Sequence, residues 1–159
     1  MTLNERSFRD AMARFATGVT VVAAVDPAGN PCGMTANSVA SVSLVPPMVL
    51  VCVDQESSSH DLIMDAGAFA VSVLGTEHEG MARRFAGKSQ EERFPGLRYE
   101  TGTTGSPILE GALAWLDCRV WKCMTAGDHT IVIGEVQDCG AREGAPLVFF
   151  KGSFQRPVW

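Results

Sequence analysis

The sequence lacks a long hydrophobic run and lacks an excess of basic charge. Its longest apolar stretch, Met48 to Val53, has six residues, whereas a membrane-spanning helix needs about 18–20. With 13 basic and 18 acidic side chains the net charge is −5, which is the wrong sign for a domain that binds a phosphate backbone. We therefore expect neither membrane insertion nor nucleic-acid binding.

Several catalytic signatures are also missing. No two glycines are separated by a single residue, so the GxGxxG dinucleotide-binding pattern cannot occur. GxSxG and HExxH are absent, and Gly87-Lys88-Ser89 is not a phosphate loop because Ala82 stands where its first glycine is required. The three histidines, 60, 78 and 129, are too scattered to form a local ligand set.

Cysteine usage gives no sign of a metal or disulfide framework. The five cysteines contain no CxxC pair, and we interpret them as reduced thiols with no metal bound. No apolar stretch follows a basic segment at the N-terminus, so no secretory signal is predicted. We expect a cytoplasmic protein.

The length favours one domain spanning residues 1–159, with a mass of 17.0 kDa. A chain of this size buries roughly 68–70% of its unfolded surface, which is enough for a hydrophobic core. Extended runs are predicted at 17–25, 32–43, 48–53, 68–74, 112–124, 129–138 and 146–151. Most connections are too short for parallel crossovers, so the prediction is a mainly β fold, an antiparallel Greek-key barrel with about three short flanking helices.

The three helices are predicted from their capping patterns. The first follows the capping-box pair Thr2 and Glu5 and carries an apolar stripe at helical spacing, which consists of Phe8, Ala11, Met12 and Phe15. Serines 57–59 can cap a second helix that ends at Gly67, and Thr76 with Glu79 begins a third that ends at Gly87. We interpret His60 and His78 as surface or capping residues and 88–111 as a loop.

The run 32–43 consists of small residues, which is unusual for a strand. Alternation places apolar side chains on one face and hydroxyls and an amide on the other. The apolar set is Met34, Ala36, Ala40 and Val42, and the polar set is Thr35, Asn37, Ser41 and Ser43. The polar face is either a solvated surface or a ligand-binding wall.

Three segments together resemble a known family. They are Phe15 to Val22, Gly33 to Cys52 and Gly127 to Ile131, and they resemble the short-chain flavin reductases, which are the NAD(P)H:flavin oxidoreductase components of two-component flavin monooxygenases. The likeness extends from Phe8 to about Gly152. It implies a homodimeric split β-barrel that binds FMN or FAD, reduces it with NADH or NADPH, and passes the reduced flavin to a separate monooxygenase.

The resemblance also implies site residues. Those along the flavin are Met34, Thr35, Ala36, Asn37, Ser38, Ser41, Val42, Ser43, Cys52, Val53 and Asp54. Those toward the flavin phosphate or the adenylate half of FAD are Ser57, Ser58, Ser59, Phe85, Ala86, Lys88 and Arg93. His129 lies near the nicotinamide as the candidate catalytic residue, with Asp128 to fix its tautomer and Phe149 and Phe150 bordering the site.

The residues themselves agree with parts of this assignment. A flavin ring needs a flat wall, close backbone approach and a few polar groups along one edge, and a helix start rich in serine suits a phosphate. Two alternatives remain open at this point. One is a noncatalytic flavin-binding or electron-transfer module, and the other is a pyridoxamine-phosphate-oxidase-like flavoenzyme on the same barrel.

Overall fold

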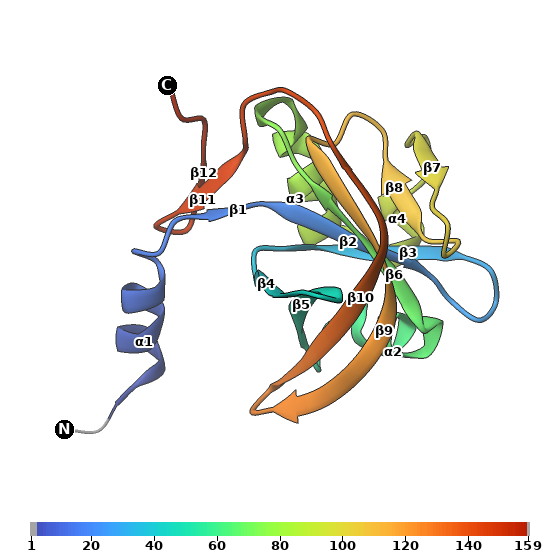
Figure 1. Cartoon of the computed structure of the whole chain (residues 1–159). Helices are drawn as coiled ribbons and strands as arrows, with labels where there is room; N and C mark the ends of the chain where they lie inside the picture. The colour runs from blue at the N-terminus through green and yellow to red at the C-terminus, as the bar shows by residue number, and fades with distance from the viewer. Residues whose placement is uncertain (1–2, 159) are drawn as a thin grey trace.

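The computed structural model describes residues 3–158. Its main feature is a seven-stranded antiparallel sheet in the order β3-β2-β6-β9-β10-β5-β4, shown in Figure 1. The strands are β2 (Thr20–Val25), β3 (Pro31–Ala36), β4 (Val39–Leu44), β5 (Pro47–Asp54), β6 (Ala68–Val73), β9 (Ala114–Ala126) and β10 (His129–Ala141). The expectation of a mainly β, antiparallel fold is confirmed.

The connection between β3 and β4 explains why this sheet curls. These strands are the two opposite edges of the sheet, yet only Asn37 and Ser38 separate them in the chain. Three peptide steps span at most about 11 Å, so the two edges must approach each other. The result is a barrel with an open seam between β3 and β4. The prediction of one extended run over 32–43 was wrong, because the chain crosses the seam at Asn37 and Ser38, in the middle of that run.

Smaller strands lie outside the main sheet. β1 (Thr17–Gly18), β11 (Val148–Phe150) and β12 (Ser153–Gln155) form a three-stranded sheet in the order β1-β11-β12. β7 (Tyr99–Thr101) pairs with β8 (Pro107–Leu109). The prediction that 88–111 is a loop was therefore wrong, since it contains this hairpin and the helix α4 (Gln90–Arg93).

The first helix, α1 (Glu5–Met12), begins at a different cap from the predicted one. Its N-cap is Asn4, whose side chain accepts a hydrogen bond from the Ser7 amide at 2.8 Å. The predicted cap Thr2 lies outside the described residues. None of the helix is buried, and the apolar residues of its stripe stay exposed, namely Phe8, Met12 and Phe15. α1 stands away from the barrel (Figure 1).

The helices α2 and α3 end where the sequence predicts. α2 (His60–Ala66) stops at Gly67, which has a φ of +71° and so uses the conformation that glycine adopts without steric cost. α3 (Glu79–Gly87) ends at Gly87, but the predicted start was wrong. A short 3₁₀ turn, η1 (Thr76–His78), precedes it, because His78 Nδ1 accepts a hydrogen bond from the Gly75 amide at 3.2 Å and tightens the chain there.

The core has two layers, one on each face of β2. Val22 and Ala24 face the barrel interior with residues such as Val53, whereas Val21 and Ala23 face outward under α3. Five consecutive residues of β2 are buried for this reason. Among residues 3–158, no helix is long and apolar enough to cross a membrane.

Candidate functional site

A groove opens beside the seam between β3 and β4. A cavity of about 170 Å³ is lined by Val19, Thr35, Ala36, Asn37, Ala86, Phe149 and Phe154. A second cavity of about 320 Å³ shares two of these residues, Asn37 and Phe149, and extends along α1 toward Lys151. The structure thus brings together five predicted site residues from three distant segments.

Two of the hydroxyls on the seam are already hydrogen-bonded within the chain. Thr35 Oγ1 donates to the Ala82 carbonyl at 2.6 Å, and Ser38 Oγ donates to the Cys52 carbonyl at 2.7 Å. The Cys52 amide in turn donates to the Ser38 carbonyl at 3.1 Å, so the link between the edges is pinned to β5. Asn37 is the exposed polar side chain that lines both seam cavities.

The other predicted residues of β3, β4 and β5 differ in accessibility. Ser41 and Val42 are exposed, while Ser43 and Met34 are half-buried. Cys52 is half-buried, and burial raises the pKa of its thiol. Val53 is fully buried in the barrel core, so only its main chain can face a ligand.

The segment Ser57–Ser59, which we call the serine loop, leads from β5 to α2. Ser57 Oγ is buried and has no hydrogen-bond partner in the described chain. Ser59 is 1% exposed and donates to the Gly33 carbonyl at 3.2 Å. A buried hydroxyl without a hydrogen-bond partner destabilises the folded protein unless a ligand or a water molecule bonds to it. A phosphate, whose oxygens accept hydrogen bonds, fits this requirement.

The predicted basic and aromatic residues near α3 are divided between surface and core. Lys88 is exposed and lines a groove of about 590 Å³ with the α3 arginines. Arg93 is 7% exposed, and its guanidinium donates to the carbonyls of Lys88 and Gly33, both at 2.7 Å. Phe85 is 0% exposed, so its ring packs in the core and cannot flank a ligand. Its neighbour Ala86 lines the smaller seam cavity.

His129 is the first residue of β10, opposite Asp54 of β5 in the sheet register. Its Nδ1 is 2.7 Å from Asp128 Oδ1, and the side chain is 42% exposed. The hydrogen bond to His129 lowers the pKa of Asp128, so the carboxylate stays ionised and the histidine keeps a defined orientation. His129 lines neither of the two seam cavities, and Phe150 is half-buried on β11.

The other two histidines are less exposed than predicted. His60 is 15% exposed and its Nε2 is 2.8 Å from Thr130 Oγ1. His78 is 13% exposed and caps the chain at Gly75. The capping part of the interpretation is confirmed for His78, but neither side chain lies freely on the surface.

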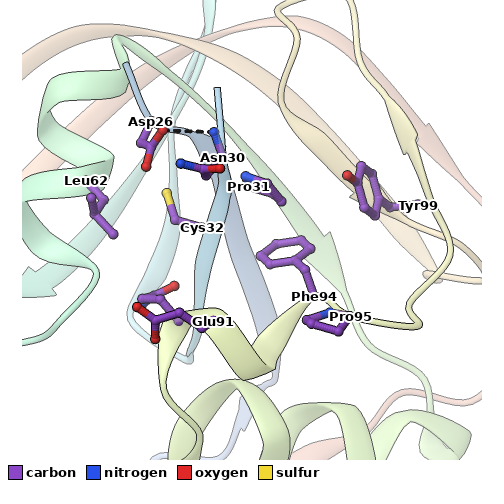
Figure 2. A pocket seen from close by; sticks show the side chains of 10 residues that line it. Asp26, Asn30, Pro31, Cys32, Leu62, Glu91, Phe94, Pro95 and Tyr99 are labelled. Atoms are coloured by element: carbon purple, nitrogen blue, oxygen red, sulfur yellow. Dashed lines mark hydrogen bonds between the residues drawn. The ribbon is translucent and has the colours of Figure 1, made fainter. Parts of the chain in front are cut away.

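A third cavity, of about 590 Å³, lies at the opposite end of β3. Figure 2 shows Leu62 and Glu91 on one side of it and Phe94 and Tyr99 on the other. Burial raises the pKa of Cys32, which also lines it, to about 11, so this thiol remains protonated at neutral pH. No residue predicted to bind flavin lines this cavity.

Sequence reasoning missed residues in two places, the seam groove and the segment that bonds to the serine loop. Val19 and Phe154 complete the smaller seam cavity, and Gln90 bonds to the serine loop. Nothing in the local pattern marks Gln90, because it stands in a segment that reads as a loop. In the described part of the chain, no three His, Cys, Asp or Glu side chains gather as metal ligands.

The family of the chain can be read from its similarity to known proteins. Residues 12–157 match the family model described as "Flavin reductase like domain". The chain belongs to this family. The match spans nearly all of the barrel, including the seam, the serine loop and His129, so each of these features is part of a flavin-reductase-like fold.

Named relatives match the chain almost from end to end. "FMN reductase (NADH) SmoA" of Agrobacterium fabrum is 44% identical over 96% of this chain and 86% of the relative. "Flavin-dependent monooxygenase, reductase subunit HsaB" of Rhodococcus jostii is 37% identical over 96% and 77%. Among solved structures, "NADH:FAD oxidoreductase SgcE6" of Streptomyces globisporus has a TM-score of 0.91 and 36% identity, covering 99% of this chain and 97% of that one.

Proposed function

We propose that this chain is an NAD(P)H-dependent flavin reductase that reduces FMN or FAD and supplies reduced flavin to a separate monooxygenase. The observation that carries the proposal is the open seam, where Asn37 and small side chains form a wall in a chain of this family. A bound flavin supplies the hydride acceptor. The relatives' names support a nicotinamide donor and a partner monooxygenase. The family match over residues 12–157 supports a single domain.

The chain's residues have separate tasks in this proposal. Thr35 to Ser38 line the flavin ring, with Asn37 as the main polar contact, and Ser41, Val42 and Ser43 contribute main-chain groups. Cys52 to Asp54 border the ring or ribityl chain. Ser57 and Ser58 hold the phosphate, and Lys88 neutralises part of its charge. Ser59 and Arg93 act indirectly, because their polar atoms already bond within the chain.

His129 positions the nicotinamide. Because Nδ1 of the neutral ring donates to Asp128, Nε2 remains an acceptor for a carboxamide N–H. Phe149 and Phe150 border the nicotinamide from β11. Orientation of this kind matters because hydride transfer requires the two reacting atoms to be held about 3–3.5 Å apart.

The decisive test is flavin-dependent oxidation of NADH and NADPH by the purified protein, run with FMN and FAD in parallel. We expect turnover far above the rate of free flavin. A protein that binds flavin without accelerating oxidation is the noncatalytic module instead. Oxidation of an amine substrate without nicotinamide would favour the pyridoxamine-phosphate-oxidase-like alternative.

Asn37→Ala is expected to raise the dissociation constant of FMN about three- to tenfold, since one hydrogen bond contributes about 0.5–1.5 kcal/mol net. Titration of flavin fluorescence measures it. Asn30→Ala is the matched control, because Asn30 lies at the far end of β3 beside the cavity of Figure 2. Equal flavin affinity in wild type and Asn37→Ala would show that the seam is misassigned.

His129→Ala is expected to raise the Michaelis constant for the nicotinamide about tenfold, which corresponds to about 1.4 kcal/mol. Flavin affinity stays within about twofold, because His129 lies outside the seam cavities. Asp128→Asn changes the same constant less, since the ring nitrogen keeps a hydrogen-bond partner. Steady-state kinetics with flavin titration separates the two constants, and a selective loss of flavin affinity would move His129 to the flavin site.

The proposed assembly is a homodimer in the cytoplasm. Large apolar side chains remain exposed on several parts of the chain, including Phe15 after α1, Val45 between β4 and β5, and Trp121 on β9. Burial of such a surface against a second copy would remove it from water. Sedimentation equilibrium should give twice the chain mass, and a monomer would contradict the dimer. The free state of all five cysteines agrees with a reducing compartment.

A further inference from the structure

Gly33 lies on the outer edge of β3, where its backbone groups have no neighbouring strand. Its amide donates to Gln90 Oε1 at 3.1 Å. Its carbonyl accepts from Arg93 Nη1 at 2.7 Å and from Ser59 Oγ at 3.2 Å. Side chains from α4 and the serine loop therefore take the place of the missing strand, which protects an edge that would otherwise be unpaired.

The other end of the Gln90 amide bonds to the serine loop. Nε2 donates to Ser59 Oγ at 2.6 Å and to Ser58 Oγ at 3.2 Å. One side chain thus joins the edge of β3 to two consecutive residues of the serine loop. Only an amide has both an acceptor oxygen and two N–H donors for this arrangement, so neither glutamate nor methionine can replace it.

These contacts decide which hydroxyls of the serine loop are available. Ser59 Oγ donates to Gly33 and accepts from Gln90 and Arg93, so its bonding capacity is used. Ser58 Oγ only accepts from Gln90, which leaves its proton free to be donated. Ser57 Oγ is buried and has no hydrogen-bond partner among residues 3–158. Two adjacent O–H donors therefore remain, and phosphate oxygens are acceptors.

We propose that Gln90 is a positioning residue that holds the serine loop against β3 and so determines the preference for a flavin that carries a phosphate. The inference rests on the proposed function, since it takes the serine loop as the phosphate site. Gln90 acts through Ser58 and Ser59 and touches no reacting atom. Loss of its amide releases the loop and weakens the phosphate contacts while the ring-binding seam is unchanged.

The test compares FMN with riboflavin, which differ only by the phosphate. Dissociation constants of both are measured for wild type, Gln90→Met, Gln90→Glu and Ser58→Ala, with the thermal midpoint of each. Glu91→Gln is the matched control, because Glu91 is the exposed neighbour of Gln90 on the same helix and lines the same cavity in Figure 2. Among the described residues, however, the bonds to Gly33, Ser58 and Ser59 are made by Gln90 and not by Glu91. We expect wild type to prefer FMN, Gln90→Met to lose at least fivefold of FMN affinity, and riboflavin affinity to change less than twofold.

Each other result has a definite meaning. Equal weakening of FMN and riboflavin by Gln90→Met would overturn the inference, because Gln90 would then only stabilise the fold. If Ser58→Ala lost the FMN preference and Gln90→Met kept it, the inference about Gln90 would be overturned. The assignment of the serine loop as the phosphate site would still stand. A wild type that binds both flavins equally would instead refute the phosphate site of the proposed function. Should Gln90→Met not fold, Gln90→Glu decides: an unchanged FMN preference overturns the inference, and a lost one supports it.

Discussion

Replacing Phe85 with alanine will lower the free energy of unfolding by about 3–5 kcal/mol, the usual cost of truncating a buried phenylalanine. The ring is completely buried and meets Phe94 edge to face, with the ring centroids 5.1 Å apart. An added Cβ at Gly33 would lie 3.2 Å from Phe85 Cε1, so the ring also supports the edge of β3. Its removal leaves a cavity between α3 and the sheet that the surrounding backbone cannot close.

Urea denaturation followed by tryptophan fluorescence measures this loss. Phe85→Leu should recover much of it, because most of the apolar volume is restored. Ala86→Leu is the matched control on the exposed side of α3, and it should reduce flavin affinity by filling the seam cavity while leaving stability nearly unchanged. If Phe85→Ala kept wild-type stability and lost flavin binding alone, the ring would belong to the site and not to the core.

Asp117→Ala is expected to cost about 1–3 kcal/mol of unfolding free energy, the range for a donor that loses its acceptor away from water. Asp117 is 0% exposed, and its carboxylate accepts hydrogen bonds from the amide and the hydroxyl of Thr104, the amide at 2.8 Å. Thr104 is half-buried and its amide would lose this acceptor, while its hydroxyl keeps Ser106 Oγ at 2.9 Å as a partner. The loop between β7 and β8 would then lose its attachment to β9.

Asp117→Asn refines the test, since its amide oxygen can still accept from the Thr104 amide while its N–H donates to the Thr104 hydroxyl oxygen, which is an acceptor as well as a donor. Its cost should be clearly smaller than that of alanine. Asp138→Asn is the control, because Asp138 lies opposite Asp117 in the β9–β10 register but is exposed, and surface changes of this kind stay within about 0.5 kcal/mol. Equal stabilities of wild type and Asp117→Ala would contradict the anchoring role.

The strands with strong β patterns could be predicted from sequence because their burial follows from local composition. The uniformly apolar stretch of β5 and the β-branched stretch of β2 are examples, and both lie inside the sheet. The division of 32–43 could not be predicted, since residues on both sides of Asn37 and Ser38 have the same small, β-compatible character. The break follows from closure of the whole sheet, which is a tertiary constraint.

The residues of the site divide in the same way. Some can be identified from the local sequence, and the others depend on how distant elements pack together. The segments that surround the groove could be identified from their residue types. The accessibility of individual groups could not, because the burial of Phe85 and Arg93 depends on how α3 and α4 lie against β3. Gln90 escaped prediction for the same reason, since its partners are 31, 32 and 57 residues away along the chain.

The open seam has a consequence for how this protein can change over evolutionary time. Amides and carbonyls on the facing edges of β3 and β4 are not needed to hold neighbouring strands together. Exposed side chains such as Asn37, Ser41 and Val42 lie there and contribute little to the packed interior. Variation at these positions can therefore alter which ligand is recognised at little cost in stability, so a combinatorial library aimed at new flavin analogues should begin at these three positions.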